Sequence, residues 1–226
     1  MTGRRGVETD RVLAALQRHV LDAGEQVEER FDRQDSLVAY TKGFRYQASS
    51  ADWVIAREPW VEDAVRVVAD GSAKNFVFTY GLVFDHSGGV LFLNDVATMR
   101  ELGSRLGDGL DPLGYAELLG ELYSGRNIDG PVVLAAAATE FFRAGGLIRD
   151  VDGFLADYPF VDASLLSAPA VRRTADEVAV EFCSYHYYLV ETTGAVDILK
   201  WTVVGGGERE GSWSRRYVAE RLERPY

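Results

Sequence analysis

The sequence is poor in the residues from which proteins build disulfides and metal sites. It holds one cysteine, Cys183, and three histidines, His19, His86 and His186. A single thiol cannot form an internal disulfide, and the sequence contains no paired-cysteine or His-Glu-x-x-His motif. We therefore expect a fold without metal or cofactor, in a reducing compartment such as the cytoplasm.

Long apolar runs are also missing. The longest, Val132–Ala138, is far shorter than the roughly 18 apolar residues of a membrane-spanning helix. Arg4 and Arg5 stand near the start, but no apolar segment of a secretory signal follows them. These absences predict a cytoplasmic protein without a membrane partner.

Basic residues are outnumbered. There are 24 lysines and arginines against 35 aspartates and glutamates, which gives a formal net charge of −11. Proteins that bind nucleic acids neutralise phosphates with clustered basic side chains, and no long basic run occurs here. We expect no nucleic-acid partner, and a small molecule or a protein instead. The oligomeric state is left open.

What the sequence does contain is an ordinary globular composition, with 47% hydrophobic residues in 226. A chain of this length buries about 70% of its unfolded surface, so it can form a core without disulfide bonds or a metal ion. Strand-like patterns at both ends flank a helical middle. This order predicts an α+β fold in which antiparallel hairpins pack with a central helical segment. We expect one domain over 1–226, with two lobes joined near 157–168 as the alternative.

The front part is expected to mix helices and hairpins. The apolar residues Leu13, Leu16, Val20, Val27 and Phe31 recur at helical spacing. The expected elements are a helix over 9–32 that can break at Gly24, a hairpin of Phe44 and Tyr46 with Trp53 and Ile55 across 49–51, a short helix over 61–69, and a hairpin between 75–84 and 90–93.

The middle is expected to be helical and the back to be a meander. The expected helices lie over 94–107, 111–125, 132–144 and 151–157, although 132–134 can begin as a strand. The expected strands lie over 170–174, 178–190 and 195–204, with turns at 175–176 and 193–194. Residues 212–222 suit a helix or a strand.

The segment Glu181–Tyr188 holds the candidate site. As a strand, it points Ser184, His186 and Tyr188 to one face and Glu181, Tyr185 and Tyr187 to the other. A two-residue turn at Thr193-Gly194 would place His186 opposite Trp201 and Tyr188 opposite Leu199. An imidazole, a hydroxyl, a phenol and an indole would then lie together on one largely apolar face of the sheet.

Such a face favours a ligand site. The first interpretation is a non-catalytic protein that holds a small molecule or a protein partner in an aromatic-lined cleft. The expected ligand-binding residues are Ser184, Tyr185, Tyr187, Trp201 and His86.

The second interpretation is a cofactor-independent isomerase, cyclase or hydrolase. His186 would act in it as general acid or base, with Tyr188 or Glu181. Two structural alternatives remain. The aromatic side chains can simply fill a core, and the apolar face of the first helix can meet a partner helix.

Overall fold

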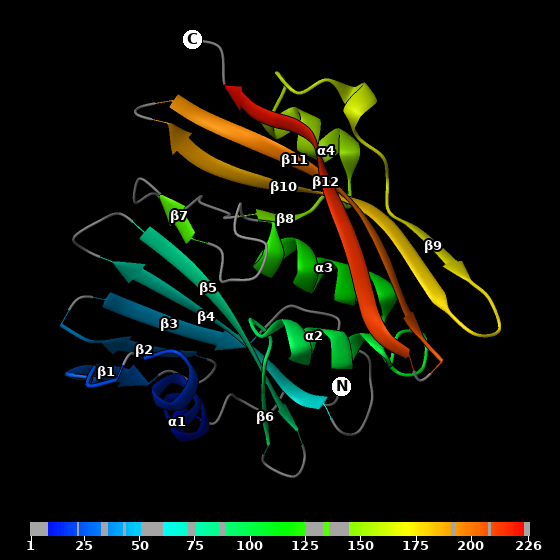
Figure 1. Ribbon diagram of the computed structural model, residues 1–226. Coiled ribbons are helices and arrows are strands. Elements are labelled where there is room, and N and C mark those ends of the chain that lie inside the picture. The colour runs from blue at the N-terminus through cyan, green and yellow to red at the C-terminus, as the bar shows by residue number, and fades with distance from the viewer. Residues whose placement is uncertain are drawn as a thin grey trace, which may run out of the picture.

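The computed structural model describes residues 9–21, 23–32, 36–42, 44–50, 61–71, 76–85, 89–124, 133–135, 145–190, 193–207 and 209–223. These residues form two antiparallel β-sheets with helices between and beside them (Figure 1). The α+β class expected from the order of patterns is therefore confirmed. Among the described residues, no helix combines the length and the apolar character needed to cross a membrane.

The first sheet has seven strands. They are β1 (Glu29–Asp32), β2 (Ser36–Tyr40), β3 (Phe44–Ser50), β4 (Val61–Gly71), β5 (Phe76–Asp85), β6 (Val90–Phe92) and β7 (Val133–Ala135). Strands β1 to β6 follow one another in order across the sheet, and β7 pairs with β5. The expected hairpin of β5 and β6 is confirmed, with Leu82 opposite Phe92.

The first helix, α1 (Thr9–His19), is shorter than expected. Gly24 has a φ of 93°, which a helix does not contain, and Phe31 lies in β1 with 54% of its surface exposed. Leu16 packs with Leu37 of β2 in the core of the first sheet. The apolar face of α1 is therefore covered by its own sheet. The helix ends at His19, before the break that was expected at Gly24, and the expectation that Phe31 lies on the same helix face is wrong.

Two other expectations for the front part are wrong. The segment expected to be a short helix over 61–69 is strand β4, whose apolar residues suit both periods and pair with β3 and β5. Ser49 and Ser50 do not form a turn, because β3 continues through them opposite Arg66 and Val65. Trp53 and Ile55 lie outside the described residues.

The second sheet has five strands near the end of the chain. They are β8 (Gly145–Leu147), β9 (Ala170–Arg173), β10 (Val178–Val190), β11 (Thr193–Gly206) and β12 (Arg209–Glu223). The order across the sheet is β12-β11-β10-β8, and β9 also pairs with β10. The three expected back strands are confirmed, and the segment left open between helix and strand is a strand.

Two helices lie between the sheets (Figure 1). They are α2 (Val96–Gly103), capped by Asp95, and α3 (Pro112–Tyr123), capped by Asp111. Helix α3 is apolar on almost every side because one core, which includes Val83, Leu119 and Phe182, joins it to both sheets. That the chain forms one domain, or two lobes joined near 157–168, stays a prediction.

Helix α4 (Val151–Asp157), followed by a 3-10 turn (Ala163–Leu165), covers the other face of the second sheet. The range of α4 agrees with the expected helix. For the segment expected over 132–144, residues 133–135 form strand β7, which agrees with the alternative that the segment begins as a strand. The helix expected after them lies outside the described residues.

Helix α2 approaches the second sheet closely enough for backbone contact. A Cβ atom on Gly103 would lie 2.6 Å from the Cα of Gly211 in β12, and one on Gly205 of β11 would lie 2.3 Å from the carbonyl oxygen of Gly103. Nearby, the Tyr115 hydroxyl donates to the Met99 carbonyl at 2.6 Å. Burial raises the pKa of Tyr115, so its phenol stays neutral.

Candidate functional site

Strand β10 carries the candidate residues in the extended form that the sequence predicts, but with a different partner for His186. His186 lies opposite Asp197 of β11, not opposite Trp201, and Tyr188 lies opposite Ala195. The expected register is wrong because Val190 pairs with Thr193, so residues 193 and 194 belong to β11 and not to a turn. Each partner is displaced by an even number of positions, which leaves every side chain on its expected face.

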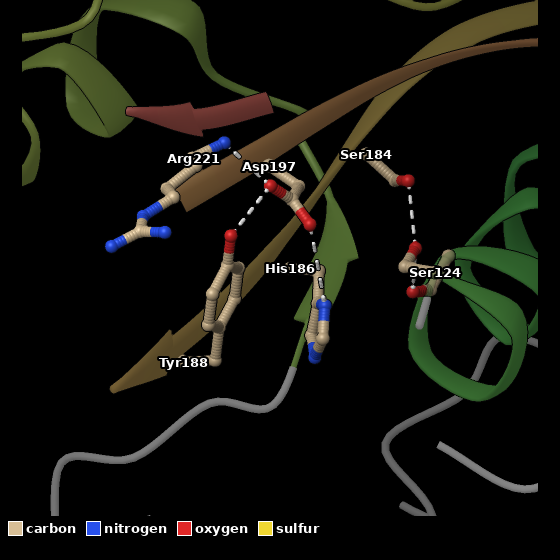
Figure 2. A network of polar contacts seen from close by, with 7 residues as sticks. Ser124, Ser184, His186, Tyr188, Asp197 and Arg221 are labelled. Carbon is tan, nitrogen blue, oxygen red and sulfur yellow. Dashed lines mark hydrogen bonds and ion pairs between the residues drawn. The ribbon is translucent and has the colours of Figure 1, made fainter. Parts of the chain in front are cut away.

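Asp197 is the centre of a polar network on this face (Figure 2). Its side chain is fully buried. The Tyr188 hydroxyl donates to Oδ1 at 3.0 Å, and the backbone N–H of Arg221 donates to the same oxygen at 2.7 Å. The other carboxylate oxygen, Oδ2, lies 4.0 Å from Nδ1 of His186. We call His186, Tyr188 and Asp197 the His186 site.

A β-bulge in β12 supplies the Arg221 donor. Val196 pairs with Leu222 and Ile198 with Ala219, so β12 has two residues opposite the single residue Asp197. One of them is Arg221, whose φ of 50° makes it the one non-glycine residue with a positive φ among those described. Residues other than glycine seldom adopt a positive φ. Bulges and strained residues concentrate at functional sites.

Asp197 places a negative charge beside His186. The imidazole is buried, with 4% of the residue exposed, so water screens the interaction weakly. A carboxylate beside Nδ1 favours a proton on that nitrogen. The Tyr188 ring lies 5.3 Å from the imidazole between centroids.

Ser184 and Trp201 belong to a second, fully buried network on the same face. The Trp201 indole N–H donates to the Ser184 hydroxyl at 2.7 Å. The same Ser184 hydroxyl is hydrogen-bonded to the Ser124 hydroxyl at 2.7 Å. Ser124 further donates to the Gly120 carbonyl in α3. Trp201 stacks on Phe182 at 5.5 Å. These contacts tie α3 to the sheet.

The remaining expected residues do not join His186. Glu181, on the opposite face, accepts from Arg172 at 2.7 Å. Tyr185 and Tyr187 are also on that face and pack against Tyr158, which follows α4. His86 lies outside the described residues.

No metal centre is formed by the described residues. They contain no group of three or more His, Cys, Asp or Glu side chains that could hold an ion. His19 is at the end of α1, where its ring stacks on Phe92 of β6 at 5.6 Å. Burial, and then the charge of Arg18, lower the pKa of His19.

Asp197, Ser124 and Arg221 were not predicted from the sequence. Asp197 had a visible signal, because it is the one charged residue in the otherwise apolar run Ala195–Leu199. A carboxylate in a buried strand requires partners, and so marks a position to examine. Ser124 and the bulge at Arg221 depend on tertiary contacts and have no comparable signal.

The site therefore combines a buried carboxylate, an imidazole and a phenol at the end of two long strands. These features can bind polar groups and transfer protons. No model of a known protein family, no curated protein and no solved structure matches this chain.

Proposed function

We propose that the protein binds a small molecule at the His186 site. The observation that supports this proposal is the bulge at Arg221, which holds a fully buried Asp197 carboxylate beside His186. An apolar strand pair would fold without either the buried charge or the strained residue. Strained backbone clusters at functional sites, and so do buried ionisable groups with a charged partner.

The burial of His186 supports a small molecule over a protein partner. With 4% of the residue exposed, the imidazole is beyond the reach of a protein surface. On the β11 side, His186 lies opposite Asp197. We place the ligand beside the imidazole edge that faces away from Asp197. A polar group of the ligand would bind Nε2 there.

The experiment is a thermal-shift screen of polar metabolites against the wild-type protein and His186→Gln. A ligand at 100 times its dissociation constant adds about 2.7 kcal/mol of stability to the wild type. We expect His186→Gln to lose most of that increase, because the ligand contacts the imidazole. Asp157→Asn, an exposed position at the end of α4, serves as the control and should keep it.

The outcome that contradicts the proposal is a ligand that stabilises the wild type and His186→Gln equally. A ligand whose effect is lost in Asp157→Asn but not in His186→Gln would also contradict it, because binding would then lie near α4.

A proton-transfer enzyme is the second candidate. The specific observation in its favour is the 4.0 Å approach of Asp197 Oδ2 to His186 Nδ1, because a carboxylate behind an imidazole makes Nε2 a better base. The reaction would be an isomerisation, cyclisation or hydrolysis without a cofactor.

If the enzyme candidate is correct, a ligand from the screen is converted during incubation with the wild type. His186→Gln should then slow conversion by about 10²- to 10⁴-fold, the usual contribution of a general acid or base. Mass spectrometry of the recovered ligand measures this. Recovery of every bound ligand unchanged would contradict the enzyme candidate and leave the binding proposal standing.

A further inference from the structure

A second group of polar side chains lies on the opposite face of the same sheet. Lys200 of β11 is directly opposite Arg216 of β12, and the next pair on that face is Thr202 opposite Ser214. Lys200 is half-buried and the other three are exposed. We call these four residues the Lys200 patch.

The two cations of the Lys200 patch face each other without an anion. Like charges directly opposite in an antiparallel pair destabilise a sheet. Among the described residues, no carboxylate forms an ion pair with either of them, although the chain has an excess of acidic residues. Nearby arginines differ in this respect, since Arg172 pairs with Glu181 at 2.7 Å and Arg209 with Glu177 at 3.8 Å.

The neighbouring strand does not cancel this charge. On β10, the residues on the same face are Cys183, opposite Lys200, and Glu181, opposite Thr202. Cys183 is fully buried and lies 3.6 Å from the Ser167 hydroxyl. Glu181 is already paired with Arg172. The Lys200 patch is therefore locally positive on a protein whose net charge is −11.

The size of the patch indicates what it can hold. Adjacent strands are about 4.8 Å apart, and alternate residues along a strand are about 7 Å apart. The four side chains therefore rise from a rectangle of roughly 5 by 7 Å, with two positive charges and two hydroxyl donors. A phosphate or diphosphate group matches this area, this charge and these donors.

We propose that the Lys200 patch binds the phosphate group of a small molecule. The bound anion would separate and neutralise the two cations, while Thr202 and Ser214 donate to its oxygens. A nucleic-acid strand does not fit as well, because it requires a row of cations that follows successive phosphates. The patch is on the face opposite His186, so this proposal does not depend on the proposed function.

The first test is calorimetric titration with inorganic pyrophosphate at low ionic strength. The double variant Lys200→Gln/Arg216→Gln should bind pyrophosphate at least tenfold more weakly than the wild type. Arg173→Gln, an exposed arginine in β9 opposite Val178, serves as the control and should bind like the wild type. Equal affinity in the double variant and the wild type would overturn the proposal.

Two further reagents serve as controls for pyrophosphate. Sodium chloride at matched ionic strength is compared by its effect on thermal stability, and a single-stranded oligonucleotide is compared by its affinity in the same titration. Chloride that stabilises the wild type as much as pyrophosphate does would overturn the proposal, because it would show charge screening without a site. An oligonucleotide that binds more tightly than pyrophosphate would also overturn it, in favour of a nucleic-acid surface.

Thermal unfolding without ligand separates a ligand site from a structural role. Removing either cation relieves their repulsion, so Lys200→Gln and Arg216→Gln should each melt no lower than the wild type. Pyrophosphate should then raise the melting temperature of the wild type and leave both variants unchanged. A lower melting temperature of both ligand-free variants would assign the cations to fold stability and overturn the proposal.

Discussion

Replacing Trp201 with alanine should lower the free energy of unfolding by about 3–5 kcal/mol, the usual cost of removing a buried aromatic side chain. Trp201 is fully buried, stacks on Phe182, and donates its indole N–H to Ser184 at 2.7 Å. The guanidinium of Arg215 covers the ring at 5.4 Å. Urea denaturation, compared with the wild type at one temperature, measures the loss.

Trp201→Phe is the matched control. It keeps an aromatic ring against Phe182 and removes the N–H that Ser184 accepts, so a loss of about 1–2 kcal/mol is expected. A loss below about 1 kcal/mol in Trp201→Ala would contradict the packing described here. Trp201 would then have to be reconsidered as the ligand-binding residue that the sequence predicts.

Replacing Asp197 with alanine should lower the free energy of unfolding by about 2–4 kcal/mol, because it removes the acceptor of two hydrogen bonds at once. The Tyr188 hydroxyl and the Arg221 N–H both donate to Oδ1. Without them, the bulge in β12 loses the contact that compensates for the positive φ of Arg221. Denaturant titration is again the measurement.

Asp197→Asn separates the hydrogen bonds from the charge. The amide oxygen can still accept from Tyr188 and Arg221, so most of the stability should remain. The negative charge beside His186 is lost, so ligand binding at the His186 site should weaken. If Asp197→Ala is as stable as the wild type, the network does not support the bulge. If Asp197→Asn binds the ligand as well as the wild type, the charge does not serve the site.

The back of the chain could be predicted well because its strands are long and rich in β-branched and aromatic residues. The bounds of β10 agree with the expected 178–190, and α4 agrees with 151–157. Register could not be predicted as well, since it depends on which residues make the turn. Each side chain of β10 and β11 was still assigned to the correct face of the sheet, because a register displaced by an even number of residues preserves the alternation of side chains.

The front of the chain was harder to predict because its patterns suit two periods. In β4, valines and alanines alternate with charged residues at spacings that a short helix also accepts. The strand forms because β3 and β5 lie on both sides of it, a pairing that local sequence does not encode.

The candidate site was predicted in part. His186 and Tyr188 were found from the strand alternation, and the structure adds Asp197 as the partner that both contact. The Arg221 donor could not be foreseen, because a bulge depends on how β12 fits against β11. Trp201 was predicted to contact a ligand, whereas it is fully buried.

The glycine contact between α2 and the last strands has a consequence for the order of assembly during synthesis. Gly103 meets Gly211, and the chain between them must be made before the contact can form. At about 5–20 residues per second, translation of these roughly 100 residues takes about 5–20 s. During that time the apolar surfaces of α2 and α3 lack their final cover. Nascent chains of this protein are therefore expected to need protection by a chaperone until β12 emerges from the ribosome.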